Sequence, residues 1–217
     1  MLFRPLLPSN VLVAEMAPVD ADPTCLPSRE RALIERAVAQ RCREFAAGRT
    51  LARGLLRDAG ADIDALLSDS DRVPIWPQTV FGSITHCGSL CAVAVVPVAH
   101  ADGIGLDVEP AVPVPEYLLP RIVRDTERAQ LAALPSALRP LGGLLVFSIK
   151  EAVYKAIYPQ CRVFLDFHQV EIAFEGDDGF VADVLVPAAA PPAHARIHGR
   201  FRIADGHVAS AVVLPRR

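Results

Sequence analysis

The sequence FSIKEAVYKA, residues 147–156, carries the pattern on which the fold and the chemistry of this chain depend. Its strong helix formers predict a helix that stops at Pro159, because proline has no backbone N–H to donate. Glu151 and Lys155 lie four residues apart on one face of that helix, and Lys150 borders the face. Glu-x-x-x-Lys is either an ordinary surface salt bridge or part of a charged site.

Upstream, GLDVE at residues 105–109 places two carboxylates on a predicted strand. Asp107 and Glu109 are separated by one residue, so both side chains leave the same face, about 7 Å apart along the backbone. Two like charges in a partly buried place are costly unless a cation neutralises them, and carboxylate oxygens suit Mg²⁺ or Mn²⁺. Pro110 follows at once, so a solvated strand end is the alternative.

A row of arginines precedes both motifs. Arg49, Arg53 and Arg57 recur at helical spacing, and Arg41 lies two turns before Arg49. Like charges at this spacing destabilise an isolated helix, and a bound phosphate would remove that cost because it matches the forked guanidinium donors. A solvated basic face is the alternative. The pair Thr85–His86 follows a predicted strand and adds a hydroxyl and an imidazole.

The order of predicted elements indicates an α+β fold. We expect helices over 28–47 and 49–59, with Gly48 as a break or a tight packing point, then strands at 83–85, 91–96 and 103–108. We expect further helices from about residue 125 and over 144–157, and strands at 170–174, 180–186, 200–203 and 207–214. Helices followed by strands thus occur twice, which predicts two similar α+β halves, 1–108 and 109–217. The stretch 187–195 is expected to be a loop.

Composition excludes several classes of protein. A chain of 217 residues with 52% hydrophobic residues can bury a large core, and a net charge of −3 gives no general attraction to nucleic acid or to acidic membranes. Five cysteines at irregular spacing, no secretion signal and no apolar run of about 18 residues predict a cytoplasmic protein with reduced thiols. Because the net charge is close to zero, any site that binds an anion must be a local cluster of charge.

Four motifs in order carry a family resemblance: Trp76-Pro77, GSITHC at 82–87, GLDVE at 105–109 and FSIKEAVYKA at 147–156. Together they resemble the Sfp-type 4'-phosphopantetheinyl transferases, and most closely the branch that contains enterobactin synthase component D. The resemblance implies a pseudo-two-fold pair of α+β halves with the active site in the cleft between them. It further implies transfer of phosphopantetheine from coenzyme A to a serine of an acyl or peptidyl carrier protein, with release of 3',5'-ADP, by a monomer.

The resemblance also implies a role for each charged residue. Asp107, Glu109 and Glu151 would bind magnesium, for which manganese can substitute, and Glu151 would also take the serine proton. Lys155 would neutralise the pyrophosphate during catalysis, with Lys150 nearby.

The remaining contacts to coenzyme A are implied in the same way. Arg41, Arg49, Arg53 and His86 would surround the 3'-phosphate, and Thr85 would donate to a phosphate. Relatives often have lysine or glycine in the loop before Trp76, whereas this chain has SDSDR at residues 68–72, so Arg72 is expected to supply the missing charge.

Three other functions fit parts of the sequence. One is a different metal-dependent phosphoryl enzyme, such as a nuclease, although the near-neutral charge speaks against nucleic acid. Another is an inactive module that binds coenzyme A or a carrier protein. The third is a zinc site, either at His86–Cys87 with Cys91 or at His194 with His198.

Overall fold

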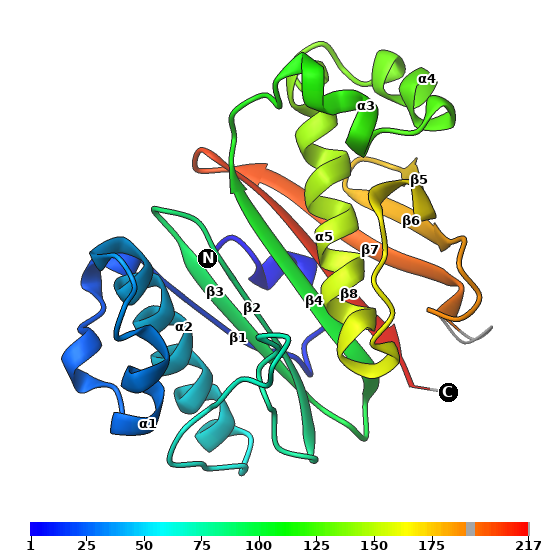
Figure 1. Ribbon diagram of the computed structural model, residues 1–217. Helices are drawn as coiled ribbons and strands as arrows, with labels where there is room; N and C mark the ends of the chain where they lie inside the picture. The colour runs from blue at the N-terminus through cyan, green and yellow to red at the C-terminus, as the bar shows by residue number, and fades with distance from the viewer. Residues whose placement is uncertain (190–193, 217) are drawn as a thin grey trace.

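The structure, a computed structural model, describes residues 1–189 and 194–216. It consists of two halves, each with a long helix packed against an antiparallel sheet (Figure 1). This arrangement confirms the predicted α+β class. Part of the predicted loop at 187–195, namely residues 190–193, lies outside the described residues.

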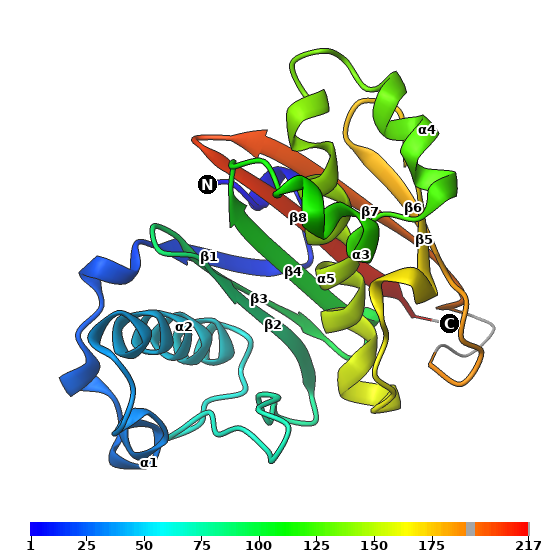
Figure 2. The ribbon, with the colours of Figure 1, turned by 45° about the horizontal axis from the view of Figure 1, so that its top comes forward.

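The N-terminal half is built on a three-stranded sheet in the order β1-β3-β2. Its strands are β1 (Leu12–Met16), β2 (Val80–His86) and β3 (Cys91–Pro97), and β3 is buried along almost its whole length. The helix α2 (Ala39–Asp58) packs against this sheet (Figure 2). The short helix α1 (Ser28–Arg31) precedes it.

The C-terminal half is built on a five-stranded sheet in the order β4-β8-β7-β6-β5. Its strands are β4 (Ala101–Pro110), β5 (Val170–Glu175), β6 (Gly179–Val184), β7 (Arg196–Ala204) and β8 (His207–Pro215). Its described residues form the α-helices α3 (Leu119–Ile122), α4 (Asp125–Ala133) and α5 (Gly142–Cys161). α5 lies along β4 and β8 (Figure 2).

The two faces of β4 have different neighbours, because successive side chains of a strand point to opposite faces. Gly103 and Gly105 meet α5: a Cβ on Gly105 would lie 1.9 Å from the carbonyl oxygen of Ala152. Ile104, Leu106 and Val108 belong to the core that β4 shares with β3 and the N-terminal residues. The glycines therefore let the helix approach the strand closely.

Two side chains join the halves where β2 runs beside β4. The backbone N–H of Leu106 donates to Ser83 Oγ at 3.0 Å, and that of Val108 donates to Thr85 Oγ1 at 3.0 Å. The two sheets are thus linked by hydroxyls at this point. β4 as a whole pairs with β8, so the predicted boundary between residues 108 and 109 falls inside a strand of the C-terminal sheet.

Some element boundaries differ from the prediction. α2 continues through Gly48, which is a tight packing point: its Cβ would lie 2.9 Å from Ile84 Cγ2. α5 continues through Pro159 to Cys161, and β1 was not predicted from the proline-rich N-terminus. Gly60, with φ at +71°, follows α2 as expected for a C-terminal glycine.

Candidate functional site

An acidic group forms where β4 meets α5. Asp107 and Glu109 lie on the same strand face as Gly105, toward the helix that carries Glu151 and Lys155. Lys155 Nζ donates to Asp107 Oδ1 at 2.6 Å. Asp107 is only 3% exposed, whereas the Lys155 side chain is 30% exposed, so this ion pair is partly buried. The structure thus brings together the four residues that two separate motifs contribute.

The charges of this group are not balanced. Burial, together with the neighbouring charge of Asp107, raises the pKa of Glu109 to about 7, although the charge of Lys155 opposes the shift. Burial also raises the pKa of Glu151, again against the effect of Lys155. Asp107 Oδ2 is buried and has no hydrogen-bond partner among the described residues. When ionised, the three carboxylates outnumber the one ammonium group by two charges.

This donor set fits a divalent cation. Carboxylate oxygens are the ligands that Mg²⁺ prefers, and a cation would relieve both the raised pKa values and the unpartnered Asp107 Oδ2. As the side chains lie, no three His, Cys, Asp or Glu residues within 1–189 and 194–216 are placed so that they could hold a metal ion. The magnesium site at Asp107, Glu109 and Glu151 stays a prediction, as Lys155 already contacts one oxygen of Asp107.

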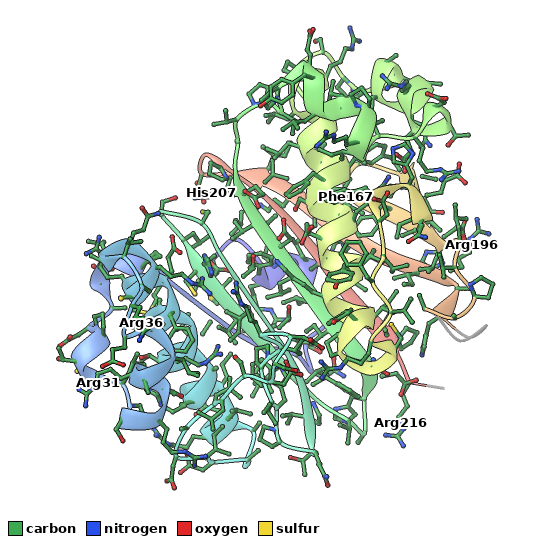
Figure 3. All side chains as sticks on the ribbon, viewed as in Figure 1. Arg31, Arg36, Phe167, Arg196, His207 and Arg216 are labelled. Carbon is green, nitrogen blue, oxygen red and sulfur yellow. The ribbon has the colours of Figure 1, made fainter. Side chains whose placement is uncertain are left out.

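A pocket of about 660 Å³ reaches the acidic group through Lys155, which lines it. Its walls come from the segment at residues 33–37, α2, the loop at residues 68–76, β2 and α5. The pocket therefore lies between the two halves, and its size is that of a typical small-molecule site. Figure 3 shows the side chains that crowd this region between the halves.

Arg49 is the buried cation of the pocket. It is 5% exposed, its guanidinium lies 4.4 Å from the centre of the Phe45 ring, and Nη2 donates to Ser68 Oγ at 2.8 Å. Its Nε is buried without a partner in the described part of the chain. Burial lowers the pKa of Arg49 to about 10, so the side chain is still charged at neutral pH. A buried, incompletely paired guanidinium is a suitable donor to a phosphate.

Arg41 and His86 lie together on the same pocket wall. Arg41 Nη1 is 2.5 Å from His86 Nε2, and His86 Nδ1 is 3.3 Å from Glu44 Oε2. Burial lowers the pKa of His86, and the neighbouring charge of Arg41 lowers it further. The imidazole is therefore neutral at pH 7 and can share a hydrogen bond with Arg41. Arg72 also lines the pocket, with its backbone at φ +66°.

Two predicted site residues are used elsewhere in the fold. Arg53 pairs with Glu30, which is fully buried and also accepts the backbone N–H of Leu66 at 2.7 Å. Lys150 is 2% exposed and donates to Glu127 Oε2 at 2.9 Å and to the Ile122 carbonyl at 2.8 Å. Neither lines the pocket. Both residues therefore have their ion-pair partners outside the pocket.

Thr85 has a structural partner as well. It is 3% exposed, and its hydroxyl oxygen accepts from Val108 across the junction of the halves. Its hydroxyl hydrogen is still free to donate, so a phosphate contact stays a prediction.

Sequence reasoning missed several residues of the pocket. Tyr154 and Tyr158 line it, and their rings stack with centroids 4.8 Å apart. The available signal was that Tyr158 follows Lys155 by three residues and Tyr154 by four, because residues three or four apart on a helix share a face. Trp76 packs over Gly82, where a Cβ would lie 2.5 Å from the indole. This contact gives the Trp-Pro and GSITHC motifs a physical connection.

Comparison with known proteins identifies the family. Residues 103–212 match the family model described as "4'-phosphopantetheinyl transferase superfamily". Residues 29–96 match the model of the "4'-phosphopantetheinyl transferase N-terminal domain". The chain belongs to the 4'-phosphopantetheinyl transferases. The two matched segments correspond to the two halves of the structure, and the transition between them precedes most of β4.

Individual relatives place this transferase within the family. It is 39% identical over 223 residues to 4'-phosphopantetheinyl transferase Svp of Streptomyces mobaraensis, covering 98% of this chain and 89% of the relative. It is 33% identical to 4'-phosphopantetheinyl transferase Npt of Nocardia iowensis, covering 97% and 99%. Enterobactin synthase component D of Escherichia coli K12 is 35% identical, covering 63% and 65%. The predicted Sfp-type identity and the relation to that branch are confirmed.

Proposed function

We propose that this transferase binds coenzyme A in the pocket between α2, β2 and α5 and moves its phosphopantetheine to a serine of an acyl or peptidyl carrier protein. The observation that carries the proposal is the connection through Lys155. One pocket holds the buried Arg49 and also reaches, through Lys155, a group of three carboxylates. Coenzyme A has the matching separation of charge, with a 3'-phosphate at one place and a pyrophosphate at another.

The residues of the chain have separate tasks in the proposed reaction. Arg49 and Arg41 bind the 3'-phosphate, with His86 holding Arg41 through its Nε2, while Lys155 neutralises the pyrophosphate. The serine oxygen forms a bond to the β-phosphorus, the bond from that phosphorus to the bridging oxygen breaks, and 3',5'-ADP leaves. Glu151, directly or through a water molecule, accepts the serine proton as the general base.

Asp107, Glu109 and Glu151 would hold the magnesium ion. A bound divalent cation would supply charge stabilisation to the pyrophosphate oxygens, beyond what Lys155 alone provides. Lys155 balances part of the charge on Asp107 and also lines the pocket, where it would neutralise the pyrophosphate.

The partners and the location of the protein are also proposals. The near-neutral charge supports an enzyme that binds neither nucleic acid nor acidic membranes. Within the described residues, no helix combines the length and the hydropathy that a membrane span requires. A cytoplasmic monomer stays our prediction.

The decisive experiment mixes the protein with apo carrier protein, coenzyme A and magnesium, and weighs the carrier by mass spectrometry. We expect the carrier to gain one phosphopantetheine, the gain to disappear with a chelator and to return with added magnesium. Asp107→Asn should lower the rate about a hundredfold or more and leave the protein folded. Asp125→Asn, at a fully exposed carboxylate on α4, is the matched control. Unmodified carriers from fatty-acid, polyketide and peptide synthesis alike would contradict the proposal.

A further inference from the structure

Two segments from different halves are joined by ion pairs beside the pocket. Arg162, directly after α5, places Nη1 at 2.6 Å from Asp69 Oδ2 and at 3.3 Å from Asp71 Oδ2. Tyr158 adds a hydrogen bond from its hydroxyl to Asp71 Oδ2 at 3.3 Å. We call these contacts of Asp69, Asp71, Tyr158 and Arg162 the clasp. Figures 1 and 2 both show the loop before β2 next to the C-terminal end of α5.

The loop side of the clasp is built around one carboxylate. Asp69 Oδ1 accepts the backbone N–H groups of Asp71 and Val73, each at 2.9 Å, and an isolated bridge between Ser68 and Pro74 closes the loop. The other oxygen, Oδ2, is thereby directed to Arg162. Asp69 therefore both shapes the loop and connects it to the opposite half.

The helix side is an unusual C-terminal cap. Arg162 has φ at +55°, in the left-handed region where a helix ordinarily ends with glycine, and its N–H donates to the Tyr158 carbonyl at 2.9 Å. Its guanidinium also lies 5.7 Å from the centre of the Tyr158 ring. Glycine would adopt this backbone more easily, so a side chain at this position needs a separate reason. The ion pairs with the loop supply one.

The clasp affects the pocket because residues in and next to the clasp line the pocket. Ser68, Asp69, Arg72 and Tyr158 line the pocket, whereas Arg162 does not. Ser68 in turn accepts the hydrogen bond from the buried Arg49. Holding the loop against α5 therefore fixes one wall of the pocket, including the charge of Arg72 and the partner of Arg49.

We propose that Arg162 is a positioning residue for coenzyme A, which it serves by clasping the loop at 68–74 to the end of α5. This inference rests on the proposed function, because it takes the pocket as the coenzyme A site. The clasp does not contact Asp107, Glu109 or Glu151, so it governs binding of the donor and leaves the chemical step to the acidic group.

The test measures KM for coenzyme A and kcat separately, at a saturating concentration of carrier protein. Arg162→Ala should raise KM about three- to tenfold and speed coenzyme A release, with kcat nearly unchanged, because the ion pairs are partly exposed. Asp69→Asn keeps the Oδ1 acceptor that shapes the loop and loses the charge, so its KM should rise similarly. Arg162→Lys should restore part of the wild-type KM.

Arg196→Ala is the matched control. Arg196 forms an exposed ion pair with Asp183 and lies at the far edge of the C-terminal half (Figure 3), so its loss should leave KM unchanged. The double variant Asp69→Asn with Arg162→Ala should show less than the product of the two single effects, since both remove the same interaction. Added salt should narrow the difference in KM between wild type and Arg162→Ala.

The possible results distinguish a failure of the clasp proposal from a failure of the proposed function. Unchanged KM in Arg162→Ala and Asp69→Asn, or a fall in kcat alone, would overturn the clasp while wild-type transfer stands. Independent effects of the two substitutions would overturn it as well. A wild-type protein that transfers nothing would instead overturn the proposed function.

Discussion

At the scale of single residues, the ionisation of Glu109 connects folding with metal binding. Its pKa in the folded protein is about 7, against a usual value of about 4.3 in an unfolded chain. Between these two pH values the folded state holds the proton more tightly than the unfolded state does. Without metal, the stability that the protonated Glu109 contributes to the folded state is therefore lost as the pH rises from about 4.5 to 7.

This reasoning gives a prediction for Glu109→Gln, which cannot ionise. In the presence of a chelator, the variant should gain stability relative to wild type as the pH is raised from 5 to 7.5, as measured by chemical unfolding at each pH. Magnesium should remove the advantage of the variant at pH 7.5, because the ionised carboxylate of the wild type then has a cation beside it. A constant difference across this range would refute the shifted pKa.

Arg49 and Arg53 lie one helical turn apart but face different partners, which leads to opposite predictions. Arg49→Ala should raise KM for coenzyme A about tenfold or more with a smaller effect on kcat, because it removes a buried donor from the pocket. Arg53→Ala should chiefly lower stability, by about 3 kcal/mol, because it leaves the fully buried Glu30 without its cation. Steady-state kinetics and thermal unfolding of both variants decide between these roles.

The contrast between Arg49 and Arg53 also shows what spacing predicts. Spacing placed Asp107 and Glu109 on one strand face and Glu151 and Lys155 on one helix face, since strand and helix periodicities fix the face on which a side chain lies. That the two pairs meet came from the family resemblance, and the Lys155–Asp107 ion pair is consistent with it. Spacing did not reveal that Glu30 and Glu127 pair with Arg53 and Lys150. Each of these ion pairs joins segments 23 residues apart in the chain, so a tertiary contact decides them.

At the scale of elements, the close packing of α5 on β4 sets the position of Glu151 relative to Asp107. Gly105→Ala should displace the helix, because the new methyl group would lie 1.9 Å from the Ala152 carbonyl oxygen. We expect a loss of roughly 2 kcal/mol or more in stability together with a fall in kcat, measured by unfolding and by carrier modification.

Gly54→Ala is the control for this prediction. A Cβ on Gly54 meets nothing within 4 Å, and the residue lies inside α2, so alanine should stabilise the protein by about 0.5–1 kcal/mol and leave kcat unchanged. Equal effects of the two substitutions would mean that the packing of α5 does not depend on Gly105.

Tertiary packing also explains why two element boundaries were wrong. Gly48 weakens a helix intrinsically, yet α2 runs through it, and Ile84 occupies the space that a side chain at this position would need. Pro159 interrupts helical hydrogen bonding, yet α5 continues to Cys161. The buried Ala156 and Ile157 hold this last turn on the core, and local propensity contains no information about them.

At the scale of the whole molecule, the site depends on how the two halves are held together. The pocket takes α2, β2 and the loop from one half and α5 from the other, and the acidic group lies within the C-terminal half. Small changes between the halves would therefore separate the contacts for the 3'-phosphate from those for the pyrophosphate. The hydroxyls of Ser83 and Thr85 are the direct connection between β2 and β4.

Thr85→Val tests this junction while keeping the shape of the side chain. The variant leaves the N–H of Val108 buried without an acceptor, which should lower stability by about 1–3 kcal/mol. Hydrogen exchange at the Val108 amide should accelerate, whereas Thr126→Val, at an exposed position on α4, should change neither quantity. If KM for coenzyme A rises while stability and exchange stay at wild-type values, Thr85 acts as the phosphate donor predicted from the sequence. A loss of stability with faster hydrogen exchange at Val108 means that the Thr85 hydroxyl holds the two halves together. Any change in KM for coenzyme A then follows from their separation.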